Sequence, residues 1–270
     1  MSRTLALTGA AAAAWLKLDG FREHDWPPLW CAPINCRAGA SVLRTRSWEE
    51  PTEVRGVLVA PVRLVLRQLA VGLAPLARWD GDRRPLTVHE LVELAVEHAL
   101  RDKEVMLSDL ASVGARTPSA RVLSDVLAMR PRGEPATGSY AETRAVQVLR
   151  GLGYPPLWRQ IEIVDGSRHL NTVDLVVPSG GVARPAVMRP ELGLLMEIDS
   201  RGYHAMEEGF EHDQRRDTNY HALGYRFVAF TPTQIERDPV RVAAAIDGAR
   251  SARHVGPQRR ARPNDGRRCE

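Results

Sequence analysis

The chain has 270 residues, enough for one large domain or two modest ones, and its 44% hydrophobic and 26% charged residues are ordinary for a soluble globular protein. No apolar run reaches the roughly 18 residues needed to cross a bilayer, so we expect no membrane partner. The formal net charge of +4 favours a polyanionic partner such as DNA or, equally, a genome that prefers arginine codons.

The first half is predicted to begin with a helix over residues 4–20, because apolar side chains recur at helical spacing and Gly20 closes the segment. A capping box, Thr87-Val88-His89-Glu90, predicts a longer helix that runs to about Arg101. Apolar spacing and flanking turn residues predict the other elements of this half: strands at 42–46 and 54–59, and helices from Pro61, at 107–113 and at 119–129.

Cysteine usage indicates a reducing cytoplasm. Cys31, Cys36 and Cys269 are odd in number and fit no zinc-binding spacing, which argues against a disulfide framework. A redox pair formed by Cys31 and Cys36 is the alternative that the spacing leaves open.

Residues 130–138 are rich in proline, glycine and charge, and we expect a domain boundary there. The segment would separate a smaller α+β domain, residues 1–130, from a second domain over residues 138–249. From residue 250 to residue 270 the chain is arginine, proline, glycine and polar side chains, which predicts a disordered basic tail.

The second domain is predicted to follow the order α-β-β-β-α-β-α, which is typical of an α/β layer fold. The elements that give this order are helices at 139–150, 207–223 and 239–249, and strands at 158–164, 169–177, 194–198 and 225–230.

Three carboxylates are predicted to meet on two neighbouring strands. Asp174 lies inside one apolar strand, and Glu197 and Asp199 flank Ile198 at the end of another, on the same face because side chains alternate. Clustered carboxylates repel each other unless a cation neutralises them, and oxygen ligands without cysteine select Mg²⁺ or Mn²⁺. The alternative is that each acid is a solvated strand end.

Other candidate residues have simple structural explanations beside the functional ones. Glu142 is the third helical residue of a second capping box that begins at Ser139. His204 either assists phosphate chemistry or is an exposed loop histidine. Arg215 and Arg216 either grip phosphate or, in the case of Arg216, pair with Asp213 on one helix face.

The residues of the second domain resemble, as an ordered set, the very-short-patch-repair-like endonuclease domains of the PD-(D/E)XK superfamily. The resemblance covers about residues 138–246 and is carried by Ser139-Tyr140-Ala141-Glu142, Gly153-Tyr154-Pro155-Pro156, Gln160, Val173-Asp174, the segment from Met196 to His204, Phe210-Glu211-His212-Asp213-Gln214-Arg215-Arg216 and the segment from Gly224 to Thr231.

This resemblance implies a restriction-endonuclease-like mixed sheet and a Mg²⁺-dependent DNA endonuclease in repair or phage defence. It places the metal ligands at Asp174, Glu197 and Glu142. The lysine of the family motif falls on Asp199, which leaves His204 as the substitute for organising the water and the phosphate, and Ser200 stands where relatives have glycine. Among the basic residues, Arg201, Arg215 and Arg216 are the expected contacts to DNA.

Residues 1–130 resemble AbiEi-type antitoxin and transcriptional-regulator relatives through the segment from Ala13 to Phe21, Val54-Arg55-Gly56-Val57 and the segment from Pro61 to Ala70. Such relatives usually begin with a winged-helix segment, which we expect to be missing here, either because the start is truncated or because this member lacks it. Two further hypotheses therefore stand beside the nuclease: a catalytically inactive DNA-binding module of the antitoxin kind, and a protein with no nucleic-acid role.

Overall fold

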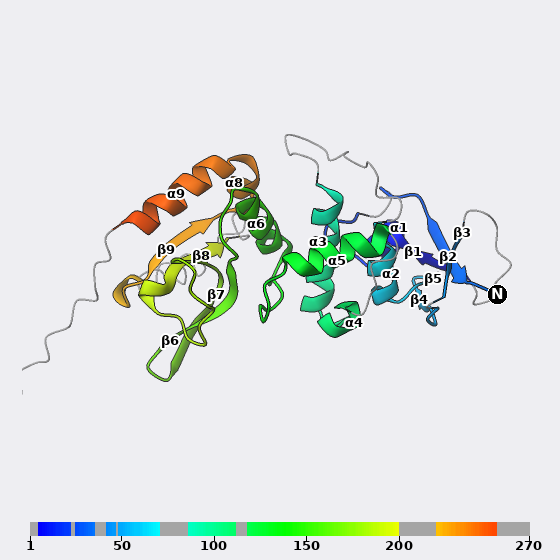
Figure 1. Ribbon diagram of the computed structural model, residues 1–270, viewed down its shortest axis with the longest axis horizontal. Helices are drawn as coiled ribbons and strands as arrows, with labels where there is room; N and C mark the ends of the chain where they lie inside the picture. The colour runs from blue at the N-terminus through cyan, green and yellow to red at the C-terminus, as the bar shows by residue number, and fades with distance from the viewer. Residues whose placement is uncertain are drawn as a thin grey trace, which may run out of the picture.

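The computed structural model of the chain describes residues 5–22, 25–35, 42–46, 48–70, 86–111, 118–199 and 220–252. These residues form two mixed sheets flanked by helices, which confirms the α/β class. Figure 1 shows one sheet at each end of the long axis, with helices α3, α5 and α6 between them. No helix among the described residues combines the length and the apolar character needed to cross a membrane.

The first sheet has the strand order β3-β2-β1-β5-β4. Part of the helix predicted over residues 4–20 is wrong: Ala6–Thr8 form the central strand β1, and helix α1 covers only Gly9–Trp15. β1 pairs with β2 on one side and β5 on the other, so its backbone groups are satisfied by neighbours far along the chain. The other strands are β2 (Leu29–Pro33), β3 (Val42–Thr45), β4 (Thr52–Val54) and β5 (Val57–Val59).

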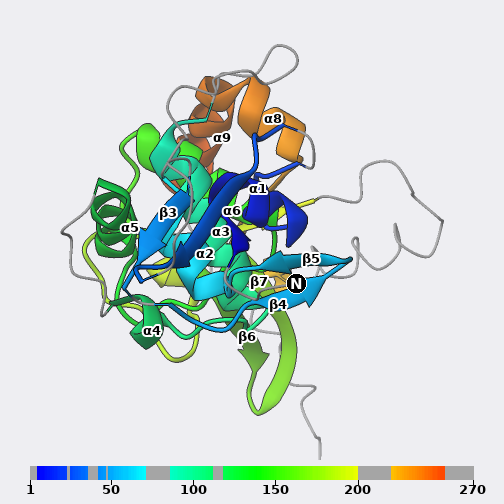
Figure 2. The ribbon, with the colours of Figure 1, turned by 90° about the vertical axis from the view of Figure 1, so that its right-hand side faces the viewer.

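Helices pack against one side of this sheet and build the first core. Figure 2 looks along the molecule from this end and shows β2 and β3 crossing in front of α3. Thr87 caps α3 through the predicted capping box. The helices of this half are α1, α2 (Val62–Gln68), α3 (Val88–Arg101), α4 (Leu107–Ala111) and α5 (Pro118–Met129).

The second sheet has the order β6-β7-β8-β9, in which the first three strands are antiparallel and β9 runs parallel to β8. Apolar side chains from three helices cover one face of this sheet, and Tyr220, Tyr225 and Met188 pack on the other. The elements are α6 (Tyr140–Gly151), β6 (Trp158–Asp165), β7 (Arg168–Pro178), the short helix η1 (Pro190–Leu192), β8 (Gly193–Ile198), β9 (Arg226–Phe230), α8 (Pro232–Arg237) and α9 (Pro239–Ser251).

The predicted strands and the first and last helices of this half are confirmed to within a few residues. Helix α8 is absent from the sequence prediction, because its six residues are too few to show a helical period. Its start is nevertheless marked by a capping box between Thr231 and Gln234. Most of the helix predicted at 207–223 lies outside the described residues.

An acidic stripe on α3 joins the two halves of the chain. Glu90, Glu93 and Glu97 recur at helical spacing and are all buried. Arg150 donates two hydrogen bonds to the Glu93 carboxylate, at 2.9 and 2.6 Å, and Arg144 lies 3.3 Å from Glu90. Because both arginines lie on α6, two charge pairs hold the helix that opens the second half against α3; the pair of Arg144 with Glu90 is buried, and that of Arg150 with Glu93 is partly exposed.

The third member of the stripe contacts three different segments. Glu97 Oε1 accepts from Arg159 at 2.6 Å and from Arg130 at 3.0 Å, and its Oε2 accepts from the Thr137 backbone N–H at 3.2 Å. Segment 130–138, which the sequence predicts to be a domain boundary, is thus tied down: Thr137 and Glu134 are both buried.

Candidate active site

Glu142 lies in the first turn of α6, and its carboxylate faces the start of β6. Its Oε2 accepts a hydrogen bond from the Gly138 N–H at 2.6 Å and from Gln160 Nε2 at 2.8 Å. The Ser139 hydroxyl accepts from the Glu142 N–H as predicted, but the carboxylate turns to Gly138, so the second half of the expected capping box is wrong. A Cβ at position 138 would lie 2.8 Å from Glu142 Oε1, so a side chain there would displace this carboxylate from its present position.

Gln160 is held in an unusual backbone conformation. Its φ is +48°, in the left-handed region that glycine normally occupies, while its neighbours Arg159 and Ile161 pair regularly with β7. Arg184 Nη2 donates to the Gln160 carbonyl at 3.3 Å, which fixes the peptide from the other side. Strained residues of this kind persist where surrounding contacts over-determine them, and they cluster at functional sites.

Asp174 follows Val173 in β7, directly across the hairpin from Gln160. Its Oδ2 accepts a hydrogen bond from the Ile198 backbone N–H at 2.8 Å. Ile198 ends β8, with Glu197 before it and Asp199 after it, so the Asp174 carboxylate contacts the peptide group that joins Glu197 to Ile198. Leu175 pairs with Met196, and the next pair in that register is Asp174 with Glu197.

Glu197 is buried on the sheet face that carries Leu195 and Tyr220. The Tyr220 hydroxyl donates to Glu197 Oε1 at 3.3 Å, and it accepts from Asn171 Nδ2 at 2.8 Å. Tyr220 is itself buried against the rings of Tyr225 and Phe227, at 6.4 and 5.2 Å between centroids. The carboxylate of Glu197 is therefore oriented by a tyrosine that is fixed on its other sides.

Asp199 directly follows β8, and its backbone N–H donates to the Phe230 carbonyl at 3.0 Å, so the pairing with β9 continues through it. Its side chain is partly exposed. The remaining residues predicted for the site or for DNA contact lie outside the described residues: Arg201, His204, Arg215 and Arg216.

The electrostatics link Glu142 to Asp174. Burial raises the pKa of Glu142, and the negative charge of Asp174 raises it further, while the hydrogen bonds from Gly138, Ser139 and Gln160 act in the opposite direction. Within the described residues no group of three or more His, Cys, Asp or Glu side chains lies close enough together to hold a metal ion. The structure therefore brings Glu142, Gln160 and Asp174 together, and it leaves the three-acid metal site as a prediction.

Two features of the site lie beyond the sequence prediction. Gln160 is part of the family resemblance, but only the structure shows it bound to Glu142. Tyr220 gives no signal in the sequence, because a tyrosine on an apolar helix face is ordinarily a core residue. That the Tyr220 hydroxyl lies beside Glu197 can be seen only in the folded structure.

The alternative of a redox pair finds no support at Cys31. This residue is a free, buried cysteine, and burial raises the pKa of its thiol to about 11. Redox-active cysteines have lowered pKa values and stand in partly exposed, electropositive surroundings. Cys36 lies outside the described residues.

Comparisons with family models, with curated proteins and with solved structures find no match to this chain.

Proposed function

We propose that the second half of the chain is a Mg²⁺-dependent DNA endonuclease of the restriction-endonuclease-like kind. The observation that carries the proposal is the bond from the Ile198 N–H to the Asp174 carboxylate, because it ties this acid to the short segment between Glu197 and Asp199. Glu142 adds a fourth acid whose pKa is raised partly by Asp174. In this proposal, acids from α6, β7 and β8 would share one metal site at this end of the sheet.

The donor set fits a hard divalent cation. All four acids offer oxygen, the described residues around them provide no cysteine, and buried carboxylates that repel each other are stabilised by a cation. Asp174, Glu197 and Glu142 would hold Mg²⁺ or Mn²⁺, with Asp199 beside them. When bound, such an ion supplies Lewis-acid stabilisation of a phosphodiester oxygen and lowers the pKa of a water molecule.

The protein's own contribution is to position these oxygens. Gln160 and Gly138 hold one oxygen of Glu142, and the Ile198 peptide holds one oxygen of Asp174. The remaining carboxylate oxygens are then oriented without further side-chain ordering, which reduces the entropy lost on binding a cation.

The deciding experiment compares plasmid nicking by the wild-type chain and by Asp174→Asn in the presence of Mg²⁺ or Mn²⁺. Asp165→Asn is the matched control, because Asp165 is an exposed acid at the far end of the same hairpin. We expect nicking by the wild type and by the control, none by Asp174→Asn, and the same circular dichroism spectrum for all three. Equal nicking by all three proteins would contradict the assignment.

A catalytically inactive DNA-binding protein is the second candidate. It is favoured by the bond from Tyr220 to Glu197 and by the lack of a three-acid group among the described residues. A salt-sensitive band shift in EDTA, with no cleavage in any divalent metal, would select it. For either candidate we propose a cytoplasmic location, which the free thiol of Cys31 fits.

A further inference from the structure

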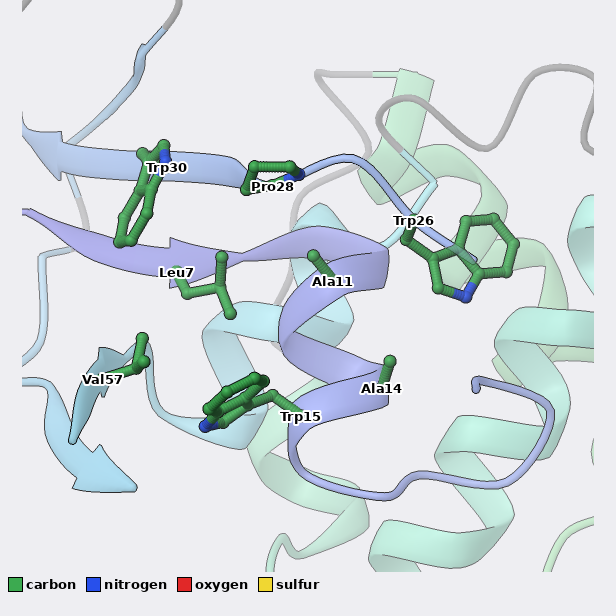
Figure 3. A pocket seen from close by; sticks show the side chains of 8 residues that line it. All are labelled: Leu7, Ala11, Ala14, Trp15, Trp26, Pro28, Trp30 and Val57. Carbon is green, nitrogen blue, oxygen red and sulfur yellow. The ribbon is translucent and has the colours of Figure 1, made fainter. Parts of the chain in front are cut away.

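Three of the chain's six tryptophans gather around one cavity beside the first sheet, which lies at the other end of the molecule from the second sheet (Figure 1). The cavity has a volume of about 250 Å³ and lies between α1 and strands β1, β2 and β5. Figure 3 shows the rings of Trp15, Trp26 and Trp30 on three sides of it. Leu7, Pro28 and Val57 complete its apolar lining.

Core packing does not explain the placement of Trp30. This side chain lies on β2 and is 37% exposed, whereas its cross-strand neighbour Leu7 is buried in the first core. An exposed indole costs free energy unless a partner covers it, and clusters of exposed apolar side chains mark binding sites. Its exposed ring borders the cavity and is available to a ligand.

The polar groups around the cavity are few and specific. Trp15 Nε1 donates to the Val54 carbonyl at 2.8 Å, so this indole is fixed in orientation. The Arg55 guanidinium lies 4.4 Å from the centroid of the Trp15 ring and also donates to the Trp15 carbonyl. Trp26 Nε1 is buried and has no hydrogen-bond partner among the described residues.

We propose that this cavity binds one unstacked nucleobase of a single DNA strand. Rings on several sides offer flat apolar faces, and bases stack on aromatic side chains regardless of sequence. Pockets for drug-sized ligands span about 300–1,000 Å³, so a cavity of about 250 Å³ suits one heterocycle rather than a larger molecule.

The neighbouring charge favours a base that carries a phosphate. Arg55 is exposed at the rim, in the turn between β4 and β5, and presents a cation beside the Trp15 ring. An apolar ligand without charge gains nothing from that cation, whereas a nucleotide places its base among the rings and its phosphate near Arg55. The proposal rests on DNA being the substrate of the proposed nuclease. The cavity would then hold a base of an unpaired strand in addition to the DNA contacts of the acid site.

The test measures fluorescence anisotropy of a labelled ten-nucleotide thymidine strand with the full chain in EDTA, where no cleavage occurs. Trp30→Ala should weaken binding by about fivefold to a hundredfold, because stacking on one aromatic ring contributes about 1–3 kcal/mol. Trp30→Phe, which keeps a ring, should restore most of the affinity. Ile34→Ala is the matched control, since Ile34 is another exposed apolar residue next to the same strand.

Competition then identifies the source of the base. If thymidine monophosphate displaces the labelled strand, the cavity is a base site that is open to free nucleotides. If only an unlabelled DNA strand displaces it, the site also needs contacts to the DNA backbone. Arg55→Gln should weaken binding of the strand and reduce the salt dependence of its affinity by about one charge. Binding of unphosphorylated thymidine should stay unchanged.

Strand affinity that is the same in Trp30→Ala as in the wild type overturns the proposal, and so does the absence of any strand binding by the wild type. These results are independent of the nuclease proposal, because plasmid nicking depends on Asp174 and is measured separately in Mg²⁺. Nicking without strand binding contradicts only the base site, and strand binding without nicking contradicts only the nuclease.

Discussion

Arg159 and Glu97 form an ion pair of 2.6 Å in which both side chains are only 2% exposed. The pair joins α3 of the first half to the residue that precedes Gln160 in the second. Glu134 adds to it, since its carboxylate accepts the Arg159 backbone N–H at 2.8 Å and contacts Arg184. The left-handed conformation of Gln160, and with it the position of Glu142, therefore depends on contacts made by the first half of the chain.

Removing the charge of Glu97 should destabilise the whole protein. Glu97→Gln leaves Arg159 and Arg130 without their carboxylate, and breaking a buried ion pair costs about 3–5 kcal/mol. Urea denaturation measures the loss. Glu162→Gln is the control, because Glu162 is exposed on β6 and should change the free energy of unfolding by less than about 0.5 kcal/mol. A loss in Glu97→Gln no larger than in the control contradicts this account.

The raised pKa of Glu142 gives a defined pH dependence. Below the ordinary value of 4.5 the carboxyl is protonated in both the folded and the unfolded chain. As the pH rises, the unfolded chain loses this proton first, so the stability that the group contributes is lost as the pH passes through the raised folded-state pKa. We expect Glu142→Gln to unfold at higher urea concentration than the wild type at pH 7, with the difference disappearing toward pH 4.

The opposite order at pH 7, with Glu142→Gln less stable than the wild type, would show that the hydrogen bonds to Glu142 outweigh its burial and the repulsion from Asp174. Glu162→Gln again serves as the control, because Glu162 is exposed on β6.

The strain at Gln160 can be separated from its hydrogen bond by two substitutions. Gln160→Ala removes the bond to Glu142 and keeps a Cβ at a φ of +48°, whereas Gln160→Gly removes both. Because a non-glycine residue in the left-handed region costs roughly 1–2 kcal/mol, the glycine variant should be the more stable of the two by about 1 kcal/mol. Thermal denaturation of both variants checks this, and a more stable alanine variant refutes it.

The Tyr220 hydroxyl should matter for Glu197 in particular. Tyr220→Phe removes the bonds to Glu197 and Asn171 and should lower the free energy of unfolding by about 1–3 kcal/mol. It should also change the increase in Tm produced by Mg²⁺, because it alters how a predicted ligand is oriented. Tyr225→Phe, which loses a bond to the Met188 carbonyl, should destabilise similarly and leave the response to Mg²⁺ unchanged.

Sequence patterns predict the second sheet well because its signals are local. β7 and β8 are apolar runs long enough to show strand character, and they place Asp174 and Glu197 within them. β1 is different, since Ala6–Thr8 continue without a break into the alanine-rich helix α1. Its strand conformation comes from pairing with residues more than 20 positions away, which no local pattern encodes.

The contacts that fix the candidate site are the part that the sequence leaves open. An acidic face on an amphipathic helix is normally a solvated face, so Glu90 and Glu93 give no indication of burial. Their partners Arg144 and Arg150 are more than 50 positions away. The left-handed Gln160 likewise has no signature, because glutamine is not a residue type enriched in that conformation.

The acidic stripe of α3 has a consequence for inheritance. A recombination event that moved residues 138–249 onto an unrelated partner would leave Arg159 without the Glu97 carboxylate, and Arg144 with Glu236 but without Glu90. Only donors that bring a helix with acids at the spacing of Glu90, Glu93 and Glu97 would rescue such a chimera. We therefore expect α3 and residues 138–249 to be inherited together.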